Sequence, residues 1–220
     1  MATKDFLEET VCNLCGANEY SIVYKNKYEN ETAQDLKDKF KSSGDETLID
    51  QVVKCKQCGL IYINPRIKPD LILQGYSEGS DEIFVSQAPG RERTFARCLD
   101  IIERYTQNKR GKILDIGAAN GSFLFVAKQR GWEISGVEPN VWMCNWAKKH
   151  YEVAINPSTL FEQKYPDKSF DVITIWGVLE HVPNPNAVLE ECNRILKEEG
   201  VLVINYPNIG SWIAKILGRK

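Results

Sequence analysis

Residues 113–121 of this 220-residue chain read Ile113-Leu114-Asp115-Ile116-Gly117-Ala118-Ala119-Asn120-Gly121, a mostly apolar run that passes into a turn of small residues. The apolar run is typical of a buried strand, and a stretch with helical periodicity follows the turn. Glycine lets the backbone of such a turn come close to a ligand, because it carries no Cβ. In parallel sheets, ligands bind beyond the carboxyl ends of the strands. The segment therefore predicts an α/β sheet with a ligand site at this turn.

Strand and helix patterns alternate along the rest of this region. The predicted elements are a strand at Lys112–Ile116, a helix at Ser122–Arg130, a strand at Glu133–Val137, a helix at Val141–His150, strands at Val153–Ile155 and Asp171–Trp176, a helix at Asn186–Lys197 and a strand at Val201–Asn205. This alternation is typical of βαβ units, so we expect a parallel sheet with helices on both faces, within a domain at 111–208. Before it, Phe95, Leu99, Ile102 and Tyr105 fall at helical spacing and predict an amphipathic helix.

Two pairs of cysteines mark a separate module near the amino terminus. They are Cys12, Cys15, Cys55 and Cys58. Each pair is followed by glycine, which permits the left-handed backbone of a tight turn around a metal-bound thiolate. Two such turns complete a tetrahedral site, so the pattern predicts a structural zinc ribbon at 1–70, with four unligated thiols as the alternative. A charged insertion at 29–50, holding one short helix near Gln34–Phe40, is expected between the pairs.

The other three cysteines and the composition bear on the class of protein. Cys98, Cys144 and Cys192 lie in helical patterns and are expected to pack in the core. The formal net charge of -2 offers no general attraction to nucleic acid. No apolar run approaches the length of a membrane span, and the first residues lack the apolar stretch of a signal peptide. We therefore expect a cytoplasmic protein without a nucleic-acid or membrane partner.

Two carboxylates indicate the kind of ligand at the turn. Glu138 follows the next predicted strand, roughly 20 residues after the glycine turn, where a carboxylate can accept hydrogen bonds from a ribose diol. Nicotinamide dinucleotides use such a carboxylate too, which leaves NAD as an alternative. Asp115 argues against NAD, since a carboxylate at the turn repels an anionic pyrophosphate. S-adenosylmethionine instead offers an ammonium and a sulfonium group, so the two carboxylates favour it.

Across most of residues 112–208 the chain resembles the class I S-adenosylmethionine-dependent methyltransferases. The resemblance rests on Leu114-Asp115-Ile116-Gly117, Gly121, Gly136-Val137-Glu138-Pro139, Ser169-Phe170-Asp171-Val172-Ile173 and Val178-Leu179-Glu180-His181-Val182, in that order. The cysteine module in front of them is similar to one branch of that family, which includes sugar C-methyltransferases and methyltransferases of polysaccharide clusters. The resemblance implies a Rossmann-like sheet and S-adenosylmethionine as the cofactor.

The resemblance also implies which residues contact this cofactor. They are Asp115, Gly117, Ala118, Ala119, Gly121, Glu138, Pro139, Asn140, Thr159, Leu160 and Trp176. The residues of the turn would surround the methionine part, Glu138 would hold the ribose, and the loop with Thr159 would contact adenine. For Thr159 an ordinary loop position is the alternative, and for Trp176 the alternative is core packing.

Methyl transfer is an in-line displacement that mainly requires the alignment of two reactants and the exclusion of water. His181 follows the fourth strand and is the candidate base, because an imidazole titrates at about pH 6.5. Glu180 would orient this segment. Residues 71–110 are expected to form a connector and the amphipathic helix, and the glycines around Tyr76 suit a lid over the cofactor, with a flexible surface loop as the alternative.

In the resembled family the sheet continues beyond the strand at Val201–Asn205 with an antiparallel hairpin. Only residues 206–220 follow that strand here, and 209–220 predict a short amphipathic tail. We therefore expect a fragment of a longer protein whose last strand is an exposed edge. The edge or the tail could form a contact in a homo-oligomer.

Three functions are consistent with these patterns. The leading hypothesis is a methyltransferase whose acceptor is a small molecule such as a sugar or sugar nucleotide. The first alternative is an RNA methyltransferase that grips its substrate with the zinc ribbon. The net charge argues against it, as does Ile175-Trp176-Gly177-Val178, which lacks the Asn/Asp-Pro-Pro-aromatic motif of base amino-group methylation. The second alternative is a binding module that keeps the cofactor fold without turnover.

Overall fold

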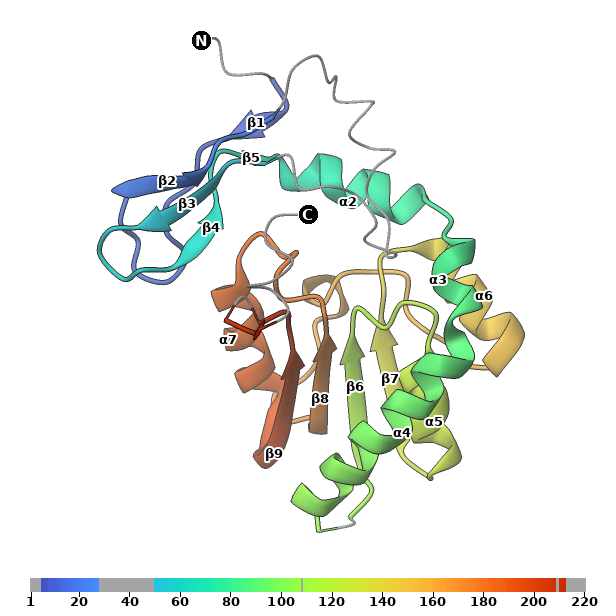
Figure 1. Cartoon of the computed structure of the whole chain (residues 1–220). Coiled ribbons are helices and arrows are strands. Elements are labelled where there is room, and N and C mark those ends of the chain that lie inside the picture. The colour runs from blue at the N-terminus through green and yellow to red at the C-terminus, as the bar shows by residue number, and fades with distance from the viewer. Residues whose placement is uncertain (1–4, 28–49, 108, 209, 213–220) are drawn as a thin grey trace. The chain divides into compact units, whose positions relative to one another are not determined.

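The computed structural model of the chain describes residues 5–27, 50–107, 109–208 and 210–212. They belong to two compact units, one formed by Met1–Tyr76 with Asn208–Lys220 and the other by Ser77–Pro207 (Figure 1). The helix predicted near Gln34–Phe40 lies outside the described residues. None of the helices in the described ranges combines the length and the apolarity needed to span a bilayer.

The first unit contains two small antiparallel sheets. Its elements are β1 (Leu7–Glu8), β2 (Tyr20–Tyr24), β3 (Val52–Cys55), β4 (Ile61–Ile63), β5 (Arg66–Ile67) and most of α2 (Pro69–Glu78). β1 pairs with β5, and the other three strands form a sheet in the order β2-β3-β4. Phe6 and Ile67 are buried together in a small core against which α2 packs Leu71 and Ile72. Such a small core gives limited stabilisation, which is the usual reason for a metal in a module of this size.

The connector expected at residues 71–110 is helical in the structure. α2 is followed by α3 (Glu82–Ser86) and α4 (Ala88–Tyr105). Tyr76 lies within α2, so the alternative of a flexible loop there is wrong, while the lid stays a prediction. Pro69 starts α2 with its fixed backbone angle, and Asp70 places a negative charge in the first turn. Asp81 caps α3, because its Oδ1 accepts a hydrogen bond of 2.8 Å from Phe84 N. These start signals outweigh the glycines that suggested a loop.

The second unit contains a parallel sheet, as predicted. Its strands are β6 (Lys112–Ile116), β7 (Glu133–Val137), β8 (Phe170–Trp176) and β9 (Leu196–Asn205), in the order β7-β6-β8-β9 (Figure 1). Between them lie α5 (Ser122–Gln129), α6 (Val141–Tyr151), the short 3-10 helix η1 (Phe161–Gln163) and α7 (Pro185–Ile195). The chain moves from β6 to β7 on one side and returns to β8 on the other. The carboxyl ends of β6 and β8 therefore form the switch point at which ligands bind in such sheets.

Side chains alternate between the two faces of this sheet. Ile113 of β6 and Val172 of β8 pack in a core with α4, α5 and α6. Leu114 and Ile173, the next residues along the same strands, pack in a second core with α7. This alternation confirms the expected arrangement of helices on both faces.

The structure differs from the predicted elements mainly at Val153–Ile155, at the junction of α7 and β9, and at the end of α4. Val153–Ile155 is not a strand, and in its place Asn156 makes an isolated parallel bridge with Val137. Val153 and Ile155 are nevertheless buried, so their apolar pattern reports core packing rather than strand pairing. α7 ends at Ile195 rather than Lys197, because Leu196 has an extended backbone and begins β9. Tyr105 is 75% exposed, unlike the other predicted core residues of α4.

Within the described part of the chain, β9 pairs with β8 along one side only. The expected sheet edge is therefore seen in the described residues, while the tail at 209–220 lies largely outside them. A homo-oligomer through this edge stays a prediction.

Candidate functional site

The four cysteines of the two predicted knuckles lie together in the first unit. The Sγ atoms of Cys12, Cys15, Cys55 and Cys58 are all within 4.8 Å of one another. The Sγ atoms of Cys12 and Cys58 are 3.4 Å apart, and those of Cys15 and Cys55 are 3.6 Å apart. Sulfurs at about 2.3 Å from a tetrahedral zinc ion are separated by about 3.8 Å. The predicted grouping of the four cysteines is therefore confirmed, and the cluster has the size and the donor set of a structural zinc site, while the zinc ion itself stays a prediction.

Two matching turns hold these thiols in place. Gly16 N donates to Cys12 O at 2.8 Å, and Gly59 N donates to Cys55 O at 3.1 Å. Both glycines have left-handed backbones, with φ of 74° at Gly16 and 79° at Gly59. A side chain is disfavoured in that conformation, which is why glycine follows each pair.

The electrostatics of the cluster call for a cation. Backbone amide groups of Cys58 lower the pKa of Cys55 to about 6, so this thiol ionises readily. Although the Ala17 amide lowers the pKa of Cys15, burial and the three neighbouring thiols raise it on balance to about 12. The four sulfurs thus ionise together only when a positive ion offsets their mutual repulsion.

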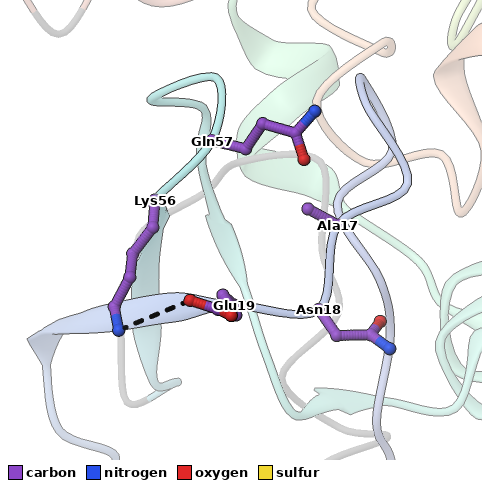
Figure 2. Close-up of a pocket in the computed structure, with 5 residues that line it drawn as sticks. All are labelled: Ala17, Asn18, Glu19, Lys56 and Gln57. Atoms are coloured by element: carbon purple, nitrogen blue, oxygen red, sulfur yellow. Dashed lines mark ion pairs between the residues drawn. The ribbon is translucent and has the colours of Figure 1, made fainter.

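An open hollow lies beside the knuckles, lined by Ala17, Asn18, Glu19, Lys56 and Gln57 (Figure 2). Its charged feature is the ion pair between Lys56 Nζ and Glu19 Oε2, at 3.8 Å. The two side chains are 59% and 82% exposed, and a pair this open to solvent contributes little energy. The hollow therefore gives no indication of a catalytic or binding site.

The predicted ligand turn in the second unit folds back on the end of β7. Gly117 N and Ala118 N both donate to Val137 O, at 2.9 and 3.0 Å. Gly117, Ala119 and Gly121 have φ of 71°, 44° and 74°. Ala119 is thus a non-glycine residue in the left-handed region, at a position where the resembled family often has glycine. Backbone strain of this kind clusters at ligand sites.

Replacing Gly117 with alanine should destabilise the second unit by about 2 kcal/mol or more, since the change adds left-handed strain and an overpacked contact. The new Cβ would clash with Val178 Cγ2. Gly90→Ala in α4 is the matched control, because there the Cβ meets only Arg93 at 3.9 Å. Urea unfolding should show a loss for the first variant and no loss for the second. Equal stability of both variants would contradict the tight turn.

Asp115 is a buried carboxylate at the end of β6. It is 1% exposed, and its Oδ1 accepts a hydrogen bond of 2.7 Å from Thr174 Oγ1 on β8. Burial raises its pKa from 3.8 to about 8; the Thr174 bond opposes the rise and the nearby charge of Glu138 adds to it. A cationic ligand group beside Asp115 would favour its charged form.

The raised pKa predicts a pH dependence of stability. Because the folded state holds the Asp115 proton more tightly than the unfolded state, its contribution is complete below about pH 4 and is lost as the pH rises to about 8. Asp115→Asn should remove this part of the slope in a plot of unfolding free energy against pH. Parallel slopes for the variant and the unchanged chain would show that Asp115 ionises normally.

Glu138 joins the two loops of the site. It is 1% exposed, its Oε2 accepts a hydrogen bond from Ala119 N at 2.9 Å, and its Oε1 accepts one from Asn140 N at 2.8 Å. The carboxylate therefore ties the glycine turn to the end of β7.

Asn140 connects the same loop to α6 and to the segment between α2 and α3. Its Oδ1 accepts a hydrogen bond from Met143 N and caps α6, while its Nδ2 donates to Gly79 O, both at 2.9 Å. Pro139, between Glu138 and Asn140, is partly buried. The structure thus brings together the predicted residues at 115–121 and 138–140.

The predicted adenine contacts have other partners in the structure. Thr159 N and Thr159 Oγ1 donate to Glu162 Oε2, at 2.6 and 2.7 Å. Leu160 is 4% exposed and belongs to the core around α7. These packing roles do not test a contact with adenine, which stays a prediction.

Trp176 packs against the core at the end of β8. Its ring centre lies 5.4 Å from that of Phe95 and 5.3 Å from that of Phe123. Its Nε1 is buried and has no hydrogen-bond partner in the part of the chain that the structure describes. The packing role is therefore shown, and the contact with a cofactor stays a prediction.

The candidate catalytic residues are not among the buried residues of the turn. Glu180 and His181 are both exposed, in a turn where His181 N donates to Val178 O at 2.9 Å. Tyr76 belongs to the first unit. Their catalytic roles stay predictions.

Two residues that the sequence interpretation missed carry unmet hydrogen-bond donors. Asn120 Nδ2 and Arg91 Nε are buried without an acceptor among the described residues. The Arg91 guanidinium lies 3.7 Å from the ring centre of Phe84, which in turn packs in a cluster with Ala119. Asn120 could have been found from the sequence, because it is a polar residue inside a turn of small residues. Arg91 could not, because it reaches the turn through Phe84 of α3, and only the fold brings α3 there.

Comparisons with known proteins identify the family of the chain. Residues 91–218 match a family described as a methyltransferase domain. The chain is 28% identical over 124 residues to the ubiquinone biosynthesis O-methyltransferase of Pasteurella multocida (strain Pm70), covering 49% of this chain and 51% of the relative. It is 31% identical over 131 residues to the protein of the same name in Idiomarina loihiensis, covering 54% of this chain and 53% of that relative.

A solved structure of an S-adenosylmethionine-dependent methyltransferase from Archaeoglobus fulgidus is similar in fold. The identity is 27%, the TM-score is 0.51, and the match covers 62% of this chain and 63% of that one. The likeness confirms the Rossmann-like architecture. The chain spans about half the length of the curated relatives that it matches.

Proposed function

Because the chain belongs to the methyltransferase domain family, we propose that it transfers the methyl group of S-adenosylmethionine to a small-molecule acceptor. The observation that carries the proposal is the pair of buried carboxylates, Asp115 and Glu138, at the glycine turn. Carboxylates there favour a ligand with an ammonium and a sulfonium group, because a nearby cation stabilises the charged form of Asp115, whose pKa burial raises to about 8; a dinucleotide pyrophosphate offers no such cation. NAD binding is therefore not favoured.

The residues of the turn fit this cofactor. Glu138 would accept hydrogen bonds from the ribose hydroxyl groups, while it keeps its bonds to the two backbone amides. Asp115 would face the ammonium group, whose charge would stabilise the ionised carboxylate. Gly117, Ala119 and Gly121 have left-handed backbones, and glycine and alanine make up all of the turn except Asn120. When bound, the cofactor supplies an activated methyl group; the protein has to align it with the acceptor and exclude water.

For the acceptor, two curated relatives are named O-methyltransferases, which supports an oxygen atom of a small molecule. A sugar or sugar nucleotide is our proposed class, on the resemblance of the cysteine module to that branch. His181 is the proposed base, because its exposure leaves it free to meet an acceptor from solvent. The RNA alternative has no support in the charge of the chain.

We also propose that the four cysteines hold a structural zinc ion. Four protein thiolates would fill all its positions, so the ion would stabilise the fold of the first unit rather than take part in the reaction.

Formation of S-adenosylhomocysteine tests the proposed activity. The full chain would be incubated with S-adenosylmethionine and separate panels of sugar nucleotides, phenols and RNA. Turnover with a small molecule supports the proposal. Binding of S-adenosylmethionine without turnover on any panel would favour the non-catalytic module, and salt-sensitive turnover with RNA alone would favour the RNA enzyme.

A further inference from the structure

The carboxyl ends of β8 and β9 form the part of the sheet edge that the proposed cofactor residues leave open. Asp115 near the end of β6 and Glu138 after β7 belong to the proposed cofactor site. Ligands of parallel sheets bind beyond the carboxyl ends of the strands. The acceptor has to be aligned with the methyl group of the cofactor. An acceptor beside this cofactor would therefore lie beyond β8 and β9.

The segment at residues 177–181 connects this edge to the glycine turn. Val178 packs directly against Gly117, where an added Cβ would clash with it. Gly177 N donates to Asn205 O at 2.9 Å, which joins the same segment to the end of β9. The side chains of this segment, and of the residue that follows Asn205, are therefore held beside the proposed cofactor site.

Glu180 places its carboxylate at this edge. Its Oε1 lies 3.7 Å from the position that a Cβ on Gly177 would occupy, so the side chain folds back toward the end of β8. Among the residues that the structure describes, none forms a hydrogen bond or an ion pair with this carboxylate. Both of its oxygens are therefore available to accept hydrogen bonds from hydroxyl groups of a ligand.

Tyr206 supplies an aromatic ring at the same edge. It follows Asn205, the last residue of β9, and is 65% exposed. An aromatic side chain has a large apolar surface that gains free energy when another molecule covers it. Small-molecule sites commonly combine such a ring with a few polar groups that fix the orientation of the ligand. Tyr206 and Glu180 are one such pair.

The ring of a hexose matches both groups. One face of such a ring presents C–H groups that pack on an aromatic ring, and its neighbouring hydroxyl groups donate charge-assisted hydrogen bonds to a carboxylate. A simple phenol has the flat ring but a single hydroxyl group, so it leaves one carboxylate oxygen unbonded. On the basis of the proposed function, we infer that Tyr206 and Glu180 bind the hexose ring of a sugar-nucleotide acceptor and determine the specificity for it.

Steady-state kinetics of the full chain test this inference, with the nucleoside-diphosphate hexose that it methylates fastest as the acceptor. Tyr206→Ala should raise the KM for this acceptor at least about tenfold and change kcat less than about threefold, because the ring binds the acceptor without taking part in the reaction. Tyr206→Phe keeps the ring and should restore the KM. Glu180→Gln should raise the KM about tenfold, as expected for lost hydrogen bonds to a charged group.

Matched variants and a second measurement separate this role from a structural one. Tyr105→Ala removes a 75% exposed tyrosine at the end of α4, ahead of the amino end of β6, and should leave the KM unchanged. Glu199→Gln does the same for an exposed glutamate near the start of β9. Calorimetry should show affinities for S-adenosylmethionine within about twofold of the unchanged chain for the Tyr206 and Glu180 variants. Equal losses of acceptor and cofactor binding would overturn the inference and make both residues structural.

The unchanged chain gives a test that needs no variant. It should methylate at least one nucleoside-diphosphate hexose in preference to phenol and catechol. Turnover of phenol or catechol without turnover of any sugar nucleotide would overturn the inference while the proposed function stands, as would an unchanged KM in both Tyr206→Ala and Glu180→Gln. Failure to bind S-adenosylmethionine, or to methylate any small molecule, would overturn the proposed function itself.

Discussion

Replacing Cys55 with serine should release the metal from the first unit and unfold its three-stranded sheet. Cys55 ends β3, and a hydrogen bond from the backbone amide of Cys58 lowers the pKa of its thiol to about 6. A serine hydroxyl stays protonated near neutral pH and is a poor zinc ligand. A structural zinc ion in a small module supplies roughly 10–16 kcal/mol of binding free energy, more than the small core around Phe6 can replace.

Native mass spectrometry and hydrogen exchange would measure the two effects. The unchanged chain should carry one zinc ion, Cys55→Ser none, and the amides of β2, β3 and β4 should lose their protection in the variant. Cys98→Ser in α4 is the control and should keep the metal, because Cys98 lies outside the cluster. A metal-free unchanged chain with protected β-strand amides would show that the cysteines are plain thiols.

Glu138→Gln should abolish useful binding of S-adenosylmethionine and weaken the second unit. The amide oxygen of glutamine can replace only one carboxylate oxygen, so its NH2 group would face the N–H of Ala119 or Asn140. A buried donor without an acceptor costs about 1–3 kcal/mol. The loss of charge-assisted bonds to both ribose hydroxyl groups should weaken binding about 100-fold.

Titration calorimetry and thermal unfolding would measure these losses. Glu133→Gln, at the exposed start of the same strand, is the matched control; its ion pair with Lys112 is mostly exposed and contributes little. It should bind like the unchanged chain. If Glu138→Gln lowers stability but binds S-adenosylmethionine with unchanged affinity, Glu138 only joins the loops and does not hold the ribose.

The sequence predicts the sheet well where local and tertiary signals agree. The bounds of β6 and β7 match the predicted strands, because apolar runs covered on both faces end at turns of small residues. At Val153–Ile155 the apolar residues are buried, as the pattern predicts, but they pack beneath the turn and do not form a strand. Around Tyr76 the glycines suggested a loop, although the start signals of α2 prevail.

The site was predictable from the sequence where it depends on residues that are close together along the chain. The cysteine pairs, Asp115 and Glu138 all stand at the ends of recognisable elements. What the sequence could not show is how the groups pair: that Glu138 bonds the amides of two loops, and that Asn120 keeps a donor without an acceptor. Such pairings depend on distances between segments that only the folded chain brings together.

The proposed function depends on binding of a cationic sulfur nucleoside at the turn formed by residues 117–121. Isothermal titration of the full chain with S-adenosylmethionine, and separately with NAD, tests this claim most directly. We expect saturable binding of S-adenosylmethionine at one site per chain and no heat of binding with NAD. Saturable binding of NAD together with no binding of S-adenosylmethionine would contradict it.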